Sequence, residues 1–454
     1  GQNDKMITIE EAIENAQALE AAGADSFYIR SSVPKMHIAQ FAPDLEFAGY
    51  NMEGNNALGS RFNYAKHYEG MAEGRYSGCA FNLKIAAEIK KNVNVPVGCS
   101  GYMDPRTAPD LMNNAVKDGL IDFMLMTRPL TVDPEMPNKL QEGRRDEVAP
   151  CTRCMHCHDR SKGGREVCRV NAATQRAYTD EMPEGYELPA ATSSKKVVVV
   201  GGGPAGMEAA RIAALRGHDV TLYEKDSTLG GLVKTANVYK GSHERLQDLI
   251  DYLVRQQELC GVNVVTDTEV DAATIKDASP DVVLLATGGT RVTKLNGSGN
   301  VSVVGIDTLT GSELGEDIII CGSNVQAIDC AAYLVAQGKN VQIVNDQPAE
   351  RLGYGQSYWF RTYVIPALQD QGVRIWNSTT VNAVTDEGLE VTLDSGCSKV
   401  LPCSCVVECY DMTPNTDLAD ALSGSCDVVA IGDCNEPNNI AYAIAAGNLA
   451  ARAL

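Results

Sequence analysis

Four cysteines are the densest group of reactive side chains in the sequence, in the spacing C-x2-C-x2-C-x10-C: Cys151, Cys154, Cys157 and Cys168. Three thiolates within seven residues can face one centre and a fourth can arrive from a distant loop, as a cubane iron–sulfur cluster requires. Structural zinc prefers two separated ligand pairs, although His156 and His158 keep zinc as an alternative, with free thiols as a third. The spacing favours a [4Fe–4S] cluster.

A glycine-rich turn follows an apolar strand at 197–200 and precedes a helix at 207–215. Its glycines permit a tight turn and close approach of a pyrophosphate, which the helix N-terminus stabilises. The next strand ends in Glu224, eighteen residues after Gly206, where a carboxylate can accept hydrogen bonds from a ribose. Together these features predict a dinucleotide site at Gly201, Gly203, Ala205, Gly206 and Glu224.

Two later strand ends are consistent with a bound flavin. The strand 282–286 ends in Thr287-Gly288, and the strand 428–431 ends in Gly432-Asp433. Asp433 is placed to accept hydrogen bonds from ribityl hydroxyls. Either strand end alone could be a plain exit into a turn. Both of them after a glycine fingerprint favour FAD as the dinucleotide.

A second turn of the same kind is less complete. The strand 318–321 leads into Gly322, but Asn324 and Ala327 stand where the pattern has glycine. Asparagine tolerates unusual backbone angles, and alanine still allows close helix packing. The following strand ends in Asn345-Asp346 instead of a single acid. We expect a dinucleotide domain with a compromised site, either functional or vestigial.

The elements that position these groups divide the chain into blocks. A chain of 454 residues is too long for one compact core, and 44% apolar with 22% charged residues is typical of globular proteins. Residues 1–150 alternate helices with short apolar strands, which predicts a parallel α/β arrangement. From residue 195 the pattern changes to strands that open into glycine-rich turns, twice over.

Charge and hydropathy exclude some classes of partner. A net charge of −20 and a pI near 4.8 argue against binding to nucleic acid or to an anionic membrane. No run of eighteen apolar residues exists, so no membrane span is expected. The first residues do not resemble a secretory signal, so we expect a cytoplasmic location and a metal site instead of a disulfide framework.

Residues 41–81 show no regular period but hold eight of the 26 aromatic residues. Long irregular segments in compact domains are usually lids or binding loops. We expect this segment to form a pocket wall for a small, flat, apolar substrate. The alternative is a satellite hydrophobic cluster under a loop.

With these motifs in this order, the chain resembles the 2,4-dienoyl-CoA reductase and enoate reductase group of the old yellow enzyme superfamily, and trimethylamine dehydrogenase shares the layout. The most specific parts are the cysteine run, the turn 201–206, Leu229-Gly230-Gly231 and Gly432-Asp433. The resemblance implies an FMN-binding (β/α)8 barrel, a [4Fe–4S] cluster, and FAD and NAD(P)H domains, with Gly231 at the FAD. It implies four segments: the C-terminal part of the barrel at 1–150, the cluster segment and linker at 151–194, the FAD domain at 195–290 plus 405–454, and the NAD(P)H domain at 291–404.

The resemblance also implies barrel residues that bind FMN. Residues 97–101 resemble the seventh strand with its phosphate loop, and 126–129 resemble the eighth strand. The implied ligands of FMN are Ser100, Gly101, Thr127 and Arg128, with Arg128 on the phosphate. His37 is the candidate catalytic donor that polarises the substrate carbonyl, and a surface loop histidine is the alternative.

Several departures from the family pattern matter. By this comparison only strands six to eight are present, and three strands cannot close an eight-stranded barrel. The chain therefore resembles the C-terminal portion of a longer protein, without the N-terminal half of the barrel and the family's proton-donating tyrosine. The cysteine spacing is nearer that of the amine dehydrogenase.

The function that the resemblance implies is reduction of an activated carbon–carbon double bond, in an enone or an enoyl thioester. Electrons would pass from NAD(P)H to FAD, then through the [4Fe–4S] cluster to FMN and the substrate. One alternative is an amine dehydrogenase-like enzyme that delivers electrons to an external flavoprotein. Another is an electron-transfer subunit without its own substrate. A homo-oligomer is possible in each case.

Overall fold

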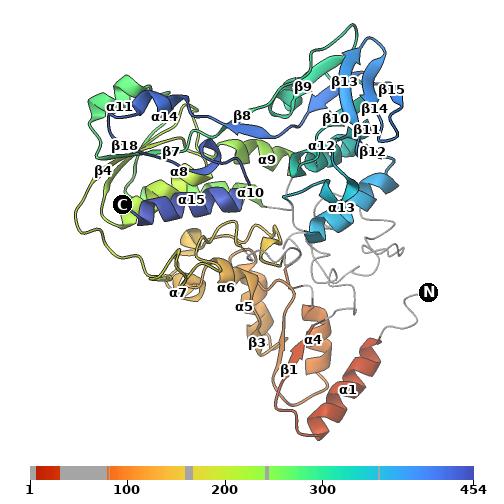
Figure 1. The fold of residues 1–454 in the computed structure, drawn as a ribbon. Coiled ribbons are helices and arrows are strands. Elements are labelled where there is room, and N and C mark those ends of the chain that lie inside the picture. The colour runs from red at the N-terminus through yellow and green to blue at the C-terminus, as the bar shows by residue number, and fades with distance from the viewer. Residues whose placement is uncertain (1–6, 31–78, 81, 159–166, 241–244, 356–357) are drawn as a thin grey trace.

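The computed structural model describes residues 7–30, 79–80, 82–158, 167–240, 245–355 and 358–454. Over this part of the chain the fold is α/β, as predicted (Figure 1). The N-terminal elements form one end of the molecule, and two parallel five-stranded sheets with their helices lie side by side at the other (Figure 1). The N-terminal elements include a third, three-stranded parallel sheet, with the order β1-β2-β3.

The N-terminal elements alternate as the sequence predicts. They are α1 (Ile9–Ala21), β1 (Phe27–Ile29), α4 (Leu83–Lys90), β2 (Val97–Cys99), α5 (Pro109–Lys117), β3 (Phe123–Met124), α6 (Arg128–Val132) and α7 (Met136–Gln141). Thr8 begins α1 with a capping box, in which its hydroxyl accepts from the Glu11 N–H at 3.3 Å and the Glu11 carboxylate accepts from the Thr8 N–H at 2.8 Å. Asp133 is extended and separates α6 from α7.

The first five-stranded sheet has the order β18-β7-β4-β5-β6. Its elements are β4 (Lys196–Val200), α8 (Pro204–Leu215), β5 (Asp219–Tyr223), α9 (Leu232–Lys240), α10 (Leu246–Cys260), β6 (Asn263–Val265), α11 (Ala272–Ala278), β7 (Val282–Leu285), α14 (Asp417–Leu422), β18 (Asp427–Ala430) and α15 (Ile440–Arg452). Alternate valines of β4 pack into cores on opposite faces, Val197 and Val199 toward α8, α10 and α15, and Val198 and Val200 toward α11 and α14. Burial on both faces explains the unbroken apolar run.

The second five-stranded sheet has the order β12-β11-β10-β16-β9. Its elements are β9 (Ser302–Gly305), β10 (Asp317–Cys321), α12 (Val325–Ala336), β11 (Asn340–Val344), α13 (Tyr358–Asp370), β12 (Arg374–Trp376) and β16 (Cys405–Glu408). An antiparallel sheet of β13 (Thr380–Thr385), β14 (Gly388–Thr392) and β15 (Ser398–Leu401) packs beside it. The sequence placed 405–408 in the FAD domain, but this strand pairs with β10 and β9 and belongs to the second sheet.

Two short crossing strands connect the units of the two large sheets. β8 (Gly289–Arg291) pairs antiparallel with β17 (Met412–Pro414), and both run between the two sheets (Figure 1). Helix α9 of the first unit also contacts α12 of the second. The chain therefore passes from one unit to the other at β8 and returns at β17. Residues of both strands line the same cavity as the first glycine-rich turn.

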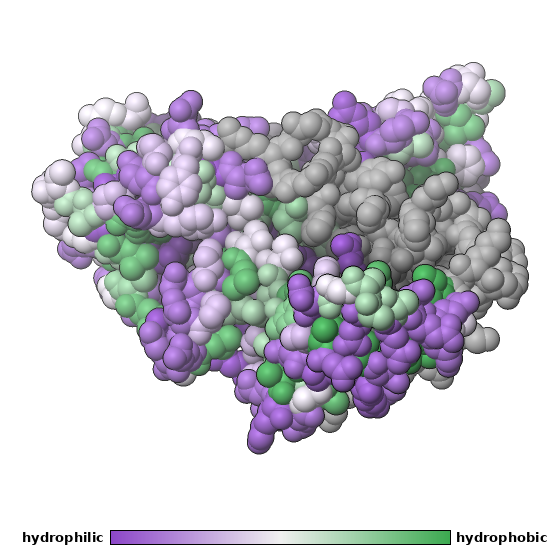
Figure 2. All heavy atoms as spheres, turned by 90° about the horizontal axis from the view of Figure 1, so that it is seen from below, coloured by the Kyte–Doolittle hydropathy of each residue, from purple (hydrophilic) through white to green (hydrophobic). Residues whose placement is uncertain are grey.

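None of the helices in the described ranges is long and apolar enough to cross a membrane. Seen from below, the described part of the surface mixes hydrophilic and hydrophobic side chains (Figure 2). Among the exposed apolar side chains are Tyr28 of β1 and Phe123 of β3, which are 48% and 36% exposed.

Candidate functional site

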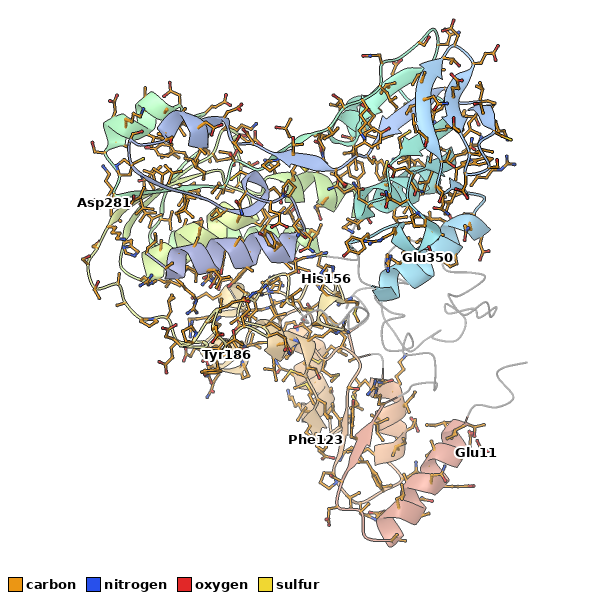
Figure 3. All side chains as sticks on the ribbon, viewed as in Figure 1. Glu11, Phe123, His156, Tyr186, Asp281 and Glu350 are labelled. Carbon is orange, nitrogen blue, oxygen red and sulfur yellow. The ribbon has the colours of Figure 1, made fainter. Side chains whose placement is uncertain are left out.

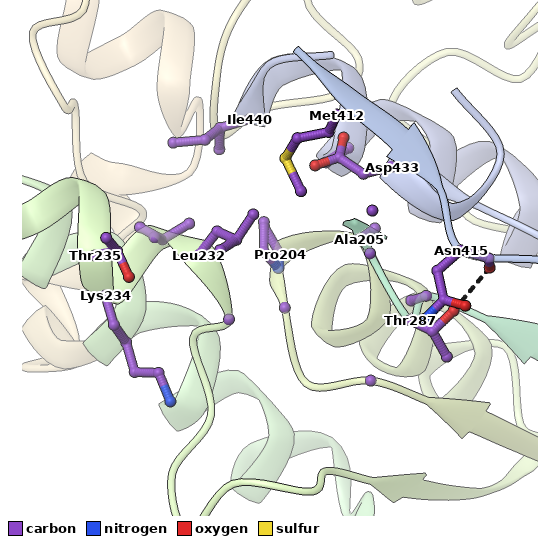
Figure 4. A pocket seen from close by; sticks show the side chains of 18 of the residues that line it. Pro204, Ala205, Leu232, Lys234, Thr235, Thr287, Met412, Asn415, Asp433 and Ile440 are labelled. Atoms are coloured by element: carbon purple, nitrogen blue, oxygen red, sulfur yellow. Dashed lines mark hydrogen bonds between the residues drawn. The ribbon is translucent and has the colours of Figure 1, made fainter. Parts of the chain in front are cut away.

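A cavity of about 720 Å³ lies at the carboxyl end of the first five-stranded sheet. Figure 4 shows its interior, with Pro204 and Leu232 facing Met412 and Asp433 across the open space. Most of the residues assigned from the sequence to the first dinucleotide site line this one cavity: Gly201, Gly203, Ala205, Glu224, Gly231, Thr287, Gly288 and Asp433. Segments more than two hundred residues apart in the chain thus form a single site.

The glycines of the first turn serve different purposes. Gly201 has φ +107°, and a Cβ there would lie 2.3 Å from the Ala286 carbonyl oxygen. A Cβ on Gly206 would lie 1.9 Å from the Gly201 carbonyl oxygen, so only glycine lets α8 pack this closely. Gly203 is extended at φ −75°, and its added Cβ would meet nothing nearer than the Gly231 Cα at 4.0 Å. The space at Gly203 is open toward the cavity, as a bound pyrophosphate requires.

Gly432 and Gly447 hold α15 close to this turn. Gly432 has φ +64°, and a Cβ on it would lie 2.8 Å from the Ala205 Cβ. A Cβ on Gly447 would lie 2.2 Å from the Ala205 carbonyl oxygen. Gly432 therefore shapes the wall of the site through packing and does not line the cavity itself.

Glu224 presents a fixed carboxylate at the end of β5. One carboxylate oxygen accepts from the Gly202 N–H at 2.6 Å and the other accepts from the Asp226 N–H at 2.9 Å. The residue is 6% exposed. Two backbone donors orient both oxygens and leave lone pairs toward the cavity, which suits ribose hydroxyls.

Asp433 is the second carboxylate of the cavity. Burial raises its pKa above the ordinary value, while the Asn438 N–H, which donates to Oδ1 at 3.0 Å, and the charge of Arg291 act in the opposite direction. Thr287, across the cavity, donates to the Asn415 carbonyl at 3.4 Å (Figure 4). A half-buried carboxylate in a cavity of this kind suits a polyhydroxyl ligand, whose hydroxyls can donate to it.

The second turn has the same backbone but not the same open space. A Cβ on Gly322 would lie 2.2 Å from the Cys409 carbonyl oxygen, so this glycine is required as Gly201 is. Asn324 is extended at φ −78°, and the expected use of its tolerance for unusual angles is wrong. Its Oδ1 accepts from the Ala327 N–H at 3.1 Å and its Nδ2 donates to the Cys409 carbonyl at 2.9 Å. The side chain of Asn324 thus caps α12 where a pyrophosphate would otherwise accept from the helix.

The four cysteines of the motif line one small cavity together with Arg128 and Arg153. Burial raises the pKa of the Cys151 and Cys157 thiols, and that of Cys168 to about 12. A metal centre would displace these protons on binding. Among the described side chains, no three of His, Cys, Asp and Glu gather closely enough to hold a single metal ion. The fit to a cluster rests on the chemistry of four sulfur donors around one cavity.

The cysteine cavity lies next to the dinucleotide cavity. Cys168 lines the first, and its neighbour Arg169 lines the second. His156, in the middle of the cysteine run, lies where the N-terminal elements meet the two dinucleotide units (Figure 3). Two consecutive residues, Cys168 and Arg169, therefore line the two different cavities.

The residues assigned to FMN follow two neighbouring strands. Ser100 and Gly101 follow β2, and Thr127 and Arg128 follow β3. Because these strands are parallel, all four residues lie at the carboxyl end of the three-stranded sheet. The Tyr28 hydroxyl donates to the Ser100 Oγ at 2.9 Å. The role of these residues in binding FMN stays a prediction. His37 lies outside the described residues, as does the aromatic segment 41–81 apart from residues 79–80.

Several wall residues of the large cavity were missed by sequence reasoning because the second unit contributes them. Arg291, Gln326 and Asp329 line the cavity from β8 and α12. Lys240 at the end of α9 pairs with Asp329 at 2.7 Å, and both side chains are buried. One signal was present, because Asp329 interrupts the apolar run of α12.

Comparison with known proteins places the chain in a family. The model of the pyridine nucleotide-disulphide oxidoreductase family matches residues 195–447. Cinnamate reductase from Clostridium sporogenes is 32% identical over 78% of this chain and 53% of that protein. Bilirubin reductase from Mediterraneibacter gnavus is 28% identical over 99% of this chain and 64% of that protein.

A solved structure matches the same arrangement. A 2-naphthoyl-CoA reductase in complex with 2-naphthoyl-CoA is 26% identical, with a TM-score of 0.79 over 98% of this chain and 63% of that one. The chain thus spans about half to two thirds of the length of these relatives. These matches confirm the resemblance drawn from the motifs. The chain belongs to the pyridine nucleotide-disulphide oxidoreductase family and is a relative of the enoate and dienoyl-CoA reductases of the old yellow enzyme superfamily.

Proposed function

We propose that this chain is the C-terminal part of an NAD(P)H-dependent reductase of activated carbon–carbon double bonds. The observation that carries the proposal is the adjacency of the two cavities through Cys168 and Arg169. A dinucleotide cavity beside a four-cysteine cavity would provide a short path for electrons. FAD, a [4Fe–4S] cluster and FMN, when bound, would carry the electrons from NAD(P)H to the double bond.

The first dinucleotide turn supports FAD as the ligand of the large cavity. The open space at Gly203 would admit the pyrophosphate, Glu224 would accept from the ribose, and Asp433 would accept from the ribityl chain. The second unit, whose α12 lines the same cavity, would hold the nicotinamide cofactor.

The three-stranded sheet supports a barrel that other residues of the protein complete. Within the described residues the sheet order is β1-β2-β3, so the outer edges of β1 and β3 have no partner strand. Unpaired sheet edges are unfavourable, and closing a barrel removes them. The exposed Tyr28 and Phe123 on these edge strands are consistent with further packing. We propose that the missing half of the barrel pairs here and that FMN binds at Ser100, Gly101, Thr127 and Arg128.

The substrate class follows from the relatives. Two of these relatives are a cinnamate reductase and a 2-naphthoyl-CoA reductase, and cinnamate and the naphthoyl group are both flat and aromatic. We propose a flat, apolar, unsaturated acid or thioester, with residues 41–81 in the pocket wall and His37 polarising the carbonyl.

The test uses the full-length protein, purified without oxygen. We expect bound FAD, FMN and about four iron atoms per chain, and oxidation of NADH or NADPH when an aryl enoate or enoyl thioester is added. Cys154→Ser should lose the iron and the turnover because a hydroxyl is a poor replacement for a thiolate. Cys260→Ser, outside the motif, is the matched control and should keep both.

Three outcomes would contradict the proposal. Stoichiometric zinc without iron would overturn the cluster. Oxidation of an amine with transfer of electrons to an external flavoprotein, without reduction of any enoate, would favour the dehydrogenase alternative. Full flavin and iron content without turnover of either substrate class would favour an electron-transfer subunit.

A further inference from the structure

Two arginines lie over the ring of Tyr102 beside the cysteine cavity. The guanidinium carbon of Arg153 lies 3.9 Å from the ring centroid, and that of Arg128 lies 4.6 Å from it. Both distances are well within the range of cation–π attraction. The Tyr102 hydroxyl donates to the Cys151 carbonyl at 3.4 Å, which ties the ring to the first cysteine of the motif. We call these three residues the arginine–tyrosine stack.

The stack is buried and held in specific backbone conformations. Tyr102, Arg128 and Arg153 are 8%, 8% and 3% exposed. Tyr102 and Arg153 have φ of +54° and +57°, in the left-handed region that residues other than glycine seldom adopt. Such a conformation costs about 1–3 kcal/mol and persists only where the surroundings impose it. Its occurrence at two residues of one stack points to a function that needs this geometry.

Each arginine of the stack contacts a sulfur atom. Arg153 donates to the Cys79 Sγ at 3.6 Å and Arg128 donates to the Met155 Sδ at 3.5 Å. Both arginines line the same small cavity as Cys151, Cys154, Cys157 and Cys168. Two permanent positive charges therefore lie in the wall of the site that holds four thiolates when a cluster is bound.

The charges have a predictable effect on a redox group. Four thiolates give an iron–sulfur cluster a net negative charge, and reduction adds one more electron. In a buried site the attraction between opposite charges is strong, and it grows with the charge of the cluster. A nearby cation thus stabilises the reduced form more than the oxidised form, which raises the reduction potential.

We propose that the arginine–tyrosine stack sets the reduction potential of the cluster, with Arg128 and Arg153 supplying the charge and the Tyr102 ring fixing both in place. The inference rests on the proposed cluster. Toward the cluster the three are positioning residues, since the cysteines alone would bind the iron; Arg128 is also a proposed ligand of FMN. A raised potential would favour the transfer of one electron from reduced flavin to the cluster.

The experiment measures the potential directly. The anaerobically purified protein is titrated with dithionite in the presence of mediators, and the electron paramagnetic resonance signal of the reduced cluster is followed. Arg153→Gln should lower the midpoint potential while the iron and sulfide content stays at the wild-type level. Arg153→Lys keeps the positive charge, so its midpoint potential should stay close to that of the wild type. Tyr102→Leu should lower the potential, whereas Tyr102→Phe, which keeps the ring, should leave it nearly unchanged.

The control is Arg144→Gln, because Arg144 forms its ion pairs with Glu142 and Glu147 at the surface. Its potential should equal that of the wild type. Equal potentials in wild type, Arg153→Gln and Tyr102→Leu, all with full iron content, would overturn the inference and leave the proposed function intact. Loss of iron in Arg153→Gln and Arg153→Lys alike would also overturn it, by showing a structural role. A wild-type protein without iron would overturn the cluster itself.

Discussion

The two glycine-rich turns have nearly the same backbone and different capacity to bind a phosphate. The residue before each helix is extended, with φ −75° and ψ 179° at Gly203 and φ −78° and ψ 177° at Asn324. Both turns also begin with a glycine pressed against the carbonyl of a neighbouring strand end, at Ala286 and at Cys409. The difference lies in one side chain. At Gly203 the helix N-terminus is free to meet a ligand, and at Asn324 the amide already satisfies it.

The strand ends beside these turns differ in the same way. Glu224 and Asn345 each lie eighteen residues after the last position of their turn. Each accepts from the backbone two residues ahead, at 2.9 Å from Asp226 and 3.1 Å from Gln347. Glu224 retains a charge for a ribose, whereas Asn345 uses its Nδ2 on the Asn377 side chain at 3.0 Å. The fold of the second turn is thus retained while its polar groups are mostly satisfied within the protein.

A helix N-terminus can thus be left open for a ligand, as at Gly203, or capped by the protein, as at Asn324. An N-cap asparagine stabilises a helix by about 1 kcal/mol relative to alanine. A bound pyrophosphate must displace that interaction before it can accept from the same N–H groups. The second turn gains helix stability without a ligand, and the first turn gains binding capacity.

The largest expected effect comes from filling the first turn. Gly203→Val places a branched side chain in the open space at the cavity, and overpacking costs about 1–3 kcal/mol. This corresponds to a roughly five- to 140-fold loss of FAD affinity. Flavin analysis of the purified protein should show little FAD with FMN retained. Asn324→Val is the matched control in the second turn and should keep FAD, and loss of FAD only in that variant would reverse the assignment of the two sites.

An intermediate effect is expected from opening the second turn. Asn324→Gly removes the cap at a cost of only a few tenths of a kcal/mol, because glycine is an acceptable N-cap. The KM for the nicotinamide cofactor should fall by about three- to tenfold, at most about 1.4 kcal/mol. Steady-state kinetics with NADH and NADPH measure it.

Asn324→Asp sharpens this test. It keeps a capping acceptor but adds a negative charge, so the KM should rise. If wild-type FAD is never reduced by either cofactor, yet the dithionite-reduced enzyme turns over substrate, the second site is vestigial and another protein donates the electrons.

The smallest effect concerns Asp433, the second carboxylate of the first site. Burial raises its pKa, so the folded flavin-free protein binds this proton more tightly than the unfolded chain. Stability is therefore lost as the pH rises from the unfolded value through the raised folded value, and the loss is complete above it. Asp433→Asn should raise the Tm of flavin-free protein by roughly 1–2 °C at pH 7, since 1 kcal/mol corresponds to about 2–4 °C in domains of 150–250 residues.

The gap in Tm between Asp433→Asn and wild type should shrink as the pH falls through the window between these two pKa values. Calorimetry at several pH values measures it. A gap that grows toward acid pH would have the wrong sign and would mean that the carboxylate is stabilised in its charged form. The same variant should retain less FAD, because the amide accepts more weakly than a carboxylate.

Local sequence determined the turns, strands and ligand types of this protein. The valine run of β4, the glycines at 201 and 206 and the position of Glu224 depend on steric limits within one strand–turn–helix unit, so short-range pattern predicts them. The cysteine spacing predicts a shared centre for the same reason, and the four side chains do line one cavity.

Only the tertiary structure decided which distant groups meet. Strand 405–408 belongs to the second sheet because it pairs with β10 and β9. These partners lie about a hundred residues earlier in the chain, so no local pattern could predict the pairing. The Lys240–Asp329 pair and the stack of Arg128 and Arg153 on Tyr102 join separate elements that no local spacing relates. Asn324 shows the same limit at short range, since its amide could have faced a ligand and instead caps α12 and bonds to Cys409. Side-chain partners across a fold depend on packing, and packing is set by the whole chain at once.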